Sequence, residues 1–134
     1  PAGGLLTRLF VAADGGAYFT GDVVSFALSD EKYKDNVQLI SDPIKKIKGI
    51  RGVSFDWNDQ QEVYQGHDVG VIAQEVESVF PEVVETRKTG KAVKYEKLTP
   101  LLIEAVKSQQ EQIESLKKCV EELTSTIDKL KQDS

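Results

Sequence analysis

A heptad pattern near the C-terminal end restricts the fold of this chain more than any other feature. Apolar residues recur there at alternating intervals of four and three, which places them in one narrow stripe along a helix. Eight of the nine stripe positions are apolar, and the nine are Leu102, Val106, Gln109, Ile113, Leu116, Val120, Leu123, Ile127 and Leu130. A lone helix would leave this seam in water, so the pattern predicts a coiled coil.

The partner helices are expected to come from other copies of the chain, because no second segment has a matching heptad pattern. We therefore predict a parallel homo-oligomer. Val or Ile at one seam position and Leu at the other favour two strands, while Gln109 in a Leu position would fix the register at some cost in stability. The alternative is a helix that packs on its own domain.

Composition excludes several classes of function. The net charge is −5, with 40% hydrophobic and 29% charged residues, which fits a folded protein and argues against a nucleic-acid partner. No apolar run approaches the ~20 residues of a membrane span, so no membrane partner is expected. The sequence begins with proline and contains no Met, which indicates an excerpt from a longer chain.

Residues 1–28 differ from the rest of the chain. They hold five of the ten glycines but only Arg8, Asp14 and Asp22 as charged residues. Two β-prone runs, residues 9–11 and 17–20, flank a turn signal at residues 14–16, and apolar alternation predicts a further strand over residues 23–28. We expect this segment to be the C-terminal end of an upstream β-rich body.

Residues 29–98 predict a small α+β globular part, followed by the coiled-coil helix over residues 99–134. Tyr33, Val37 and Ile40, at spacings of four and three, predict a short amphipathic helix that begins near Ser29. A second helix is expected over residues 43–48, with Asp42 as its cap, Pro43 at its first position and Gly49 at its end. The remaining elements are a strand over residues 53–57, a loop over residues 58–66, a helix over residues 71–80, a hairpin around residues 87–90, and a final helix opened by Thr99 and Pro100.

Few residues can carry chemistry. The chain has one histidine, His67, and one cysteine, Cys119, so a multi-histidine or CxxC metal site within one chain is excluded. We interpret His67 as a structural hydrogen-bonded residue and Cys119 as a free thiol. The glycines around Arg51 lack the lysine of a phosphate-binding loop. No metal or cofactor is expected.

Ser29 and Lys34 are the remaining candidates. A serine hydroxyl becomes a nucleophile when a base takes its proton, and a lysine amine can be that base where burial or positive neighbours lower its pKa. The other interpretation is that Ser29 only caps the helix that follows it.

A series of short motifs surrounds this pair. In chain order they are Ser29-Asp30 with Lys34, then Asn36-Val37, Val53-Ser54-Phe55-Asp56-Trp57, Gly70-Val71-Ile72-Ala73-Gln74-Glu75-Val76, Phe80-Pro81-Glu82-Val83-Val84, and Tyr95, Leu98, Leu101-Leu102 and Ala105 before the coiled coil. Together they resemble the intramolecular chaperone auto-processing domain, a self-cleaving serine peptidase domain at the C-terminus of phage tailspikes, tail fibres and neck appendages. The block around Gln74 is the specific one.

The resemblance implies roles for individual residues. Ser29 and Lys34 would form a catalytic dyad that cuts the bond between Leu28 and Ser29 once per molecule. The domain would form a homotrimer, assist the folding of the upstream fibre in a virion tail precursor made in the host cytoplasm, and leave as a free fragment. Lys32 stands where the family more often has arginine, and the seam composition favours a dimer. We expect a trimer, because Gln109 and the globular part also affect the oligomeric state.

Spacing adds a geometric condition. In a continuous helix five residues rotate by about 500°, so Ser29 and Lys34 would not share a face. Ser29 is therefore expected to lie before the helix, or Lys34 to serve a neighbouring subunit. Backbone N–H groups of residues 30–33 are candidate oxyanion donors. Two other hypotheses remain: a non-enzymatic coiled-coil assembly module, and the same processing domain in a cellular transcription factor or surface protein.

Overall fold

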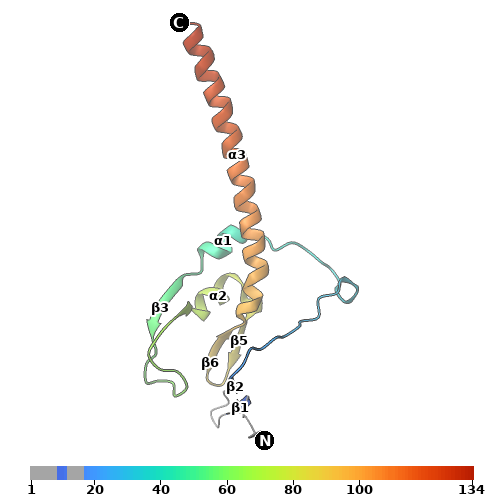
Figure 1. Ribbon diagram of the computed structural model, residues 1–134, viewed down its shortest axis with the longest axis vertical. Coiled ribbons are helices and arrows are strands. Elements are labelled where there is room, and N and C mark those ends of the chain that lie inside the picture. The colour runs from blue at the N-terminus through green and yellow to red at the C-terminus, as the bar shows by residue number, and fades with distance from the viewer. Residues whose placement is uncertain (1–8, 12–16) are drawn as a thin grey trace, which may run out of the picture. The chain divides into compact units, whose positions relative to one another are not determined.

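The computed structural model describes residues 9–11 and 17–134. Its elements are β1 (Leu9–Val11), β2 (Ala17–Phe19), the 3₁₀ helix η1 (Glu31–Tyr33), α1 (Pro43–Lys48), β3 (Gly52–Asp56), β4 (His67–Val71), α2 (Ala73–Val79), η2 (Pro81–Val83), β5 (Val84–Arg87), β6 (Gly90–Val93), η3 (Tyr95–Lys97) and α3 (Leu98–Gln132). The fold is α+β with a long C-terminal helix, as expected (Figure 1).

The chain divides into two compact units. One unit contains residues 1–37 and 54–69, and the other contains residues 38–53 and 70–134. The three sheets within the described residues have two strands each, with the pairs β1 and β2, β3 and β4, and β5 and β6. Sheets of this size are marginal alone, so the fold depends on packing against helices or other chains.

The N-terminal hairpin confirms two predicted strands. β1 and β2 pair antiparallel, with Leu9 opposite Phe19 and Val11 opposite Ala17. The predicted turn at residues 14–16 lies outside the described residues. The strand expected over residues 23–28 is wrong, because these residues belong to no strand and Phe26 is 94% exposed. Apolar alternation alone does not make a strand without a neighbour to pair with.

The amphipathic helix expected from near Ser29 is also wrong. Only the single 3₁₀ turn η1 forms, and Val37, which was expected on the buried face, is 71% exposed. A helix this short depends on a packing surface, and none covers the apolar side chains of this segment in the single chain.

The buried side chains of the second unit come from α2, η2 and the first turns of α3. Among the described residues, the buried hydrophobic side chains are Val76, Val83, Leu101 and Ala105. The hairpin of β5 and β6 has the expected place, and Gly90, the first residue of β6 after the turn, has φ +132°. α1 packs on α3, and its proline start and glycine end agree with the prediction.

The residues at the two ends of α1 show features that the sequence did not predict. Asp42 was expected to cap the helix, yet its side chain makes no capping hydrogen bond and its backbone is left-handed, with φ +49°. Gly49 lies so close to α2 that an added Cβ would be 2.7 Å from Cγ1 of Val79. This close approach explains a glycine there without any need for a special backbone angle.

β3 confirms the predicted strand up to Asp56, with Val53 and Phe55 less exposed than the other strand residues, and Trp57 follows the strand instead of ending it. The helix expected over residues 71–80 is shorter, because β4 extends to Val71 and α2 begins at Ala73. The backbone N–H of Val71 donates to the Tyr95 hydroxyl over 3.2 Å. A hydrogen bond from 24 residues away thus stabilises strand geometry that the apolar run alone did not indicate.

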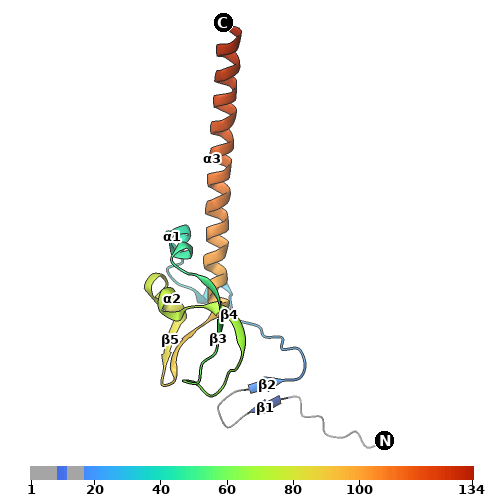
Figure 2. The same ribbon diagram turned by 90° about the vertical axis from the view of Figure 1, so that its left-hand side faces the viewer.

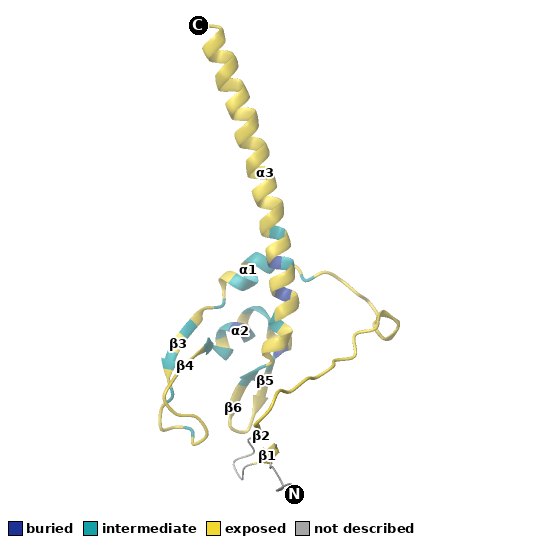
Figure 3. Ribbon diagram, in the orientation of Figure 1, coloured by how far each residue is buried: buried dark blue, intermediate teal, exposed yellow. Residues whose placement is uncertain are grey.

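α3 begins one residue before Thr99 and continues from η3, so Thr99 and Pro100 lie in its first turn instead of opening it. Near its start the helix buries Leu101 and Ala105 against the unit (Figure 3). From Gln109 onward all of its residues are exposed in the single chain, and Figure 2 shows this part extending beyond the other elements of its unit.

Candidate functional site

The segment around Ser29 folds as a tight turn. The backbone N–H of Tyr33 donates to the carbonyl oxygen of Asp30 over 3.2 Å, and that of Lys34 donates to Glu31 over 2.9 Å. Asp30 is extended, with φ −63° and ψ 132°, and its carboxylate caps the turn by accepting from the N–H of Lys32. Ser29 therefore lies before the helical turn, which is the first of the two geometries expected from the spacing of Ser29 and Lys34.

This turn brings the side chain of Lys34 back to Ser29. Lys34 Nζ lies 2.7 Å from Ser29 Oγ and 2.9 Å from the Ser29 carbonyl oxygen. Five residues of extended chain would span about 17 Å, which is far beyond the reach of a lysine side chain. The contact therefore exists because the chain folds back within η1, and it forms inside a single chain.

The arrangement suits proton transfer, because the amine is within hydrogen-bond reach of the hydroxyl proton it would accept. Ser29 and Lys34 are both exposed, and the preceding Leu28 is 79% exposed. Water surrounds the pair in the single chain.

The candidate oxyanion donors are reduced in number. The N–H groups of Lys32 and Tyr33 both bind oxygens of Asp30, so they are engaged in the turn itself. Within the described chain no hydrogen bond uses the N–H of Asp30 or Glu31. Those two groups are the turn donors that could still face a developing oxyanion.

The seam of α3 is the second functional feature. All nine seam positions are exposed, from 45% at Ile113 to 66% at Leu116 among the apolar ones. A shallow apolar depression on this helix is lined by Ile113, Leu116, Lys117, Val120 and Glu121. A continuous apolar stripe of this length is typical of an interaction surface.

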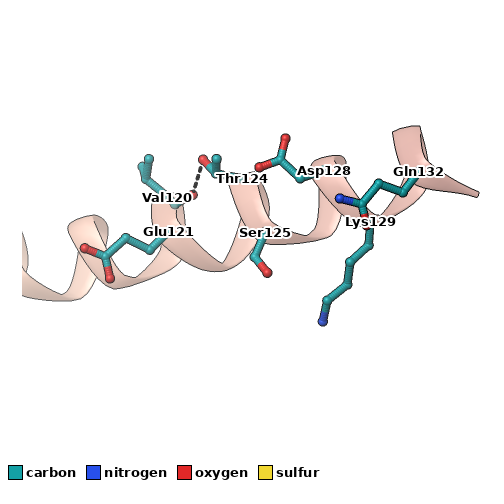
Figure 4. A pocket seen from close by; sticks show the side chains of 7 residues that line it. All are labelled: Val120, Glu121, Thr124, Ser125, Asp128, Lys129 and Gln132. Carbon is teal, nitrogen blue, oxygen red and sulfur yellow. Dashed lines mark hydrogen bonds between the residues drawn. The ribbon is translucent and has the colours of Figure 1, made fainter.

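A second depression lies further along α3 and has no catalytic character. Figure 4 shows that its seven lining residues all come from this one helix, and Thr124 donates its hydroxyl to the Val120 carbonyl oxygen over 2.8 Å. Such Ser or Thr bonds to the preceding turn are ordinary within helices. No groups from other elements converge here, so this is the open surface of a helix.

Sequence reasoning missed a clamp between Arg51 and Glu75. Glu75 accepts the backbone N–H of Arg51 over 3.0 Å and its Nε over 2.8 Å, and Nη2 binds the same carboxylate. The hydrogen bonds from Arg51 lower the pKa of Glu75 and raise that of Arg51. The sequence did carry a signal, because Glu75 belongs to the specific motif around Gln74. That its partner is Arg51 could be seen only from the folded structure.

The lone histidine and cysteine take no part in this geometry. His67 Nδ1 lies 2.9 Å from Asp56 Oδ1, and Cys119 is an exposed free thiol. The Trp57 indole donates to Asp68 over 3.1 Å, and the backbone N–H of Val69 together with this bond lowers the pKa of Asp68. Among the described residues no cluster of three His, Cys, Asp or Glu side chains could hold a metal ion.

The described helices include none that is both long and apolar enough to cross a membrane.

Comparison with known proteins adds two findings. Residues 29–85 match a family that is named as a peptidase family and described as chaperone of endosialidase. The long tail fibre protein Gp37 of Salmonella phage S16 is 29% identical over 122 residues. That alignment covers 84% of this chain and 16% of the relative, so the chain spans about a sixth of that protein. The resemblance to the intramolecular chaperone domain of phage tail fibres is thereby confirmed.

Proposed function

We propose, from the match of residues 29–85 to the chaperone-of-endosialidase family, that the chain is a self-releasing folding chaperone of a phage tail fibre. Residues 1–28 would be the end of the fibre body, residues 29–98 the globular processing domain, and residues 99–134 its coiled-coil helix. The seam of α3 would join three copies in parallel, holding three fibre chains in register while they fold.

Cleavage of the bond between Leu28 and Ser29 would follow assembly. Lys34 Nζ accepts the Ser29 hydroxyl proton, and Oγ attacks the carbonyl carbon of Leu28. The new C–O bond replaces the C–N bond, and the proton passes to the Ser29 nitrogen, which becomes a free amine. Water then hydrolyses the ester, leaving a carboxylate on Leu28 and restoring the Ser29 hydroxyl. The proximity of the pair supplies the orientation for this step.

The observation that carries this proposal is the 2.7 Å contact between Lys34 Nζ and Ser29 Oγ at the first residue of the family match. Exposure of both groups supports an order of events, because a lysine base needs a desolvated site that neighbouring copies would supply. In this scheme uncut chains wait until the trimer has formed.

Intact-mass measurement of the purified full chain tests the proposal. Wild type is expected to yield the fragment of residues 29–134, while Ser29→Ala and Lys34→Ala remain uncut. Ser25→Ala is the matched control, because it removes an exposed hydroxyl four residues upstream, and it is expected to cleave at the wild-type rate. Cleavage of Ser29→Ala at that rate would remove Ser29 as the nucleophile.

The second candidate function is a non-enzymatic coiled-coil assembly module, which the uncovered seam of α3 favours independently of the dyad. It predicts oligomers that stay uncut on prolonged incubation. Sedimentation at several concentrations separates a trimer from a dimer, and a stable monomer would contradict both functions.

A further inference from the structure

Asp30 is placed to organise the dyad without touching the bond that would be cut. Its three oxygens all bind the turn that follows: Oδ1 accepts from the Lys32 N–H over 3.1 Å, and the carbonyl oxygen accepts from the Tyr33 N–H over 3.2 Å. Oδ2 lies 3.4 Å from Lys32 Nζ. The bond from Tyr33 is the backbone bond of the 3₁₀ turn itself, whereas the bond to Oδ1 gives the Lys32 N–H a partner that the turn would otherwise leave unsatisfied.

The dyad depends on this turn. η1 has only three residues and no buried side chain, so packing does not stabilise it in the single chain. Short helices of this kind are marginal, and their end caps therefore have a large influence on how often they form. When the turn opens, Lys34 moves out of reach of Ser29.

We propose that Asp30 is a positioning residue for self-cleavage, which acts by capping the turn that carries Lys34 back to Ser29. This inference rests on the proposed function of the dyad. The cap requires a short side chain with an acceptor oxygen at the position of Oδ1, and the negative charge is secondary. Asp30 makes the productive contact a frequent state of the chain and does not itself exchange a proton.

The test compares variants that separate the cap from the charge. Asp30→Asn keeps the short acceptor and loses the charge, while Asp30→Glu keeps the charge and lengthens the side chain. Asp30→Ala loses both. The control is Asp35→Ala, which removes an exposed carboxylate with no hydrogen bond or ion pair among the described contacts.

Self-cleavage of each full chain is followed by intact mass. Asp30→Ala is expected to cleave about 2- to 30-fold more slowly than wild type, which is the factor that loss of a typical N-cap produces. Asp30→Glu is expected to cleave about as slowly as Asp30→Ala. Asp30→Asn and Asp35→Ala are expected to cleave at nearly the wild-type rate. Sedimentation and thermal unfolding are expected to be unchanged throughout, since Asp30 is exposed.

Two results overturn the inference. One is cleavage of Asp30→Ala at the wild-type rate; the other is recovery by Asp30→Glu without recovery by Asp30→Asn, which would assign the effect to charge. A second measurement is independent of cleavage, because it uses a Ser29→Ala background. There the NMR chemical shift of the Lys32 amide proton is expected to change on Asp30→Ala and to remain unchanged on Asp30→Asn. An unchanged shift in both refutes the cap, whereas cleavage of Ser29→Ala refutes only the proposed function.

Discussion

The two ends of α3 have opposite surroundings although they belong to one continuous helix. Near its start, Leu101 and Ala105 are buried against the second unit, while the neighbouring seam residues Leu102 and Val106 are 49% and 63% exposed. Beyond Gln109 the helix has one apolar stripe and no cover in the single chain. The first turns thus have one face buried within the chain and one apolar face that is exposed.

Under the proposed function this difference would divide folding from assembly. The face at Leu101 and Ala105 packs the helix on its own unit, so the helix direction does not depend on a partner chain. The seam lies on another face of the same helix and stays available. Since few side chains are buried in the described part of the single chain, assembly is expected to supply much of the stability of the whole.

The largest expected effect comes from a charge in the distal seam. Leu116→Asp would bury an unpaired carboxylate from each copy, which costs several kcal/mol and weakens association by at least about 100-fold. Sedimentation equilibrium measures this loss. Ser115→Asp adds the same charge outside the seam and is expected to leave association nearly unchanged; equal disruption by both variants would place the interface elsewhere.

A pair of adjacent leucines divides the two faces. Leu101→Ala empties a fully buried site and is expected to lower the free energy of unfolding by about 2–5 kcal/mol. Leu102→Ala alters the exposed seam, so it is expected to weaken association more than it destabilises the unit. Urea unfolding in a Leu116→Asp background isolates the unit from assembly. Equal losses of stability there would show that the two faces are not separate.

A glycine pair tests the close approach of Gly49, at the end of α1, to Val79 of α2. Gly49→Ala places a Cβ 2.7 Å from Val79 Cγ1, and overpacking of this kind costs about 1–3 kcal/mol. Gly52→Ala is the control, because a Cβ there meets nothing within 4 Å. Thermal unfolding is expected to be lowered only by the first change. If both variants unfold alike, the contact of α1 with α2 is not tight in solution.

The same contrast explains what could be predicted from the sequence. The distal part of α3 was predictable because its pattern is local and continuous. Ser29 and Lys34 could be named as a pair, but the turn between them is a 3₁₀ turn capped by Asp30, whereas apolar spacing at Tyr33 and Val37 indicated a longer helix. Likewise β4 is held at Val71 by Tyr95, and the clamp on Arg51 comes from 24 residues away. Such long-range hydrogen bonds leave no periodic signal.

The smallest expected effect concerns the clamp of Arg51 and Glu75, which belongs to the unit and not to the seam. Because hydrogen bonds from Arg51 lower the pKa of Glu75 in the folded state, the clamp contributes stability above the unfolded-state pKa, and this contribution is lost as pH falls through the folded-state pKa. Unfolding followed from pH 7 to pH 3 is therefore expected to show a smaller decline in Glu75→Gln than in wild type. Glu82→Gln removes an exposed carboxylate and is expected to keep the wild-type slope of stability against pH.

Sedimentation tests whether the clamp also affects the seam. The association measured at neutral pH is expected to be the same for wild type, Glu75→Gln and Glu82→Gln. A loss of association in Glu75→Gln alone would show that the unit and the seam are coupled.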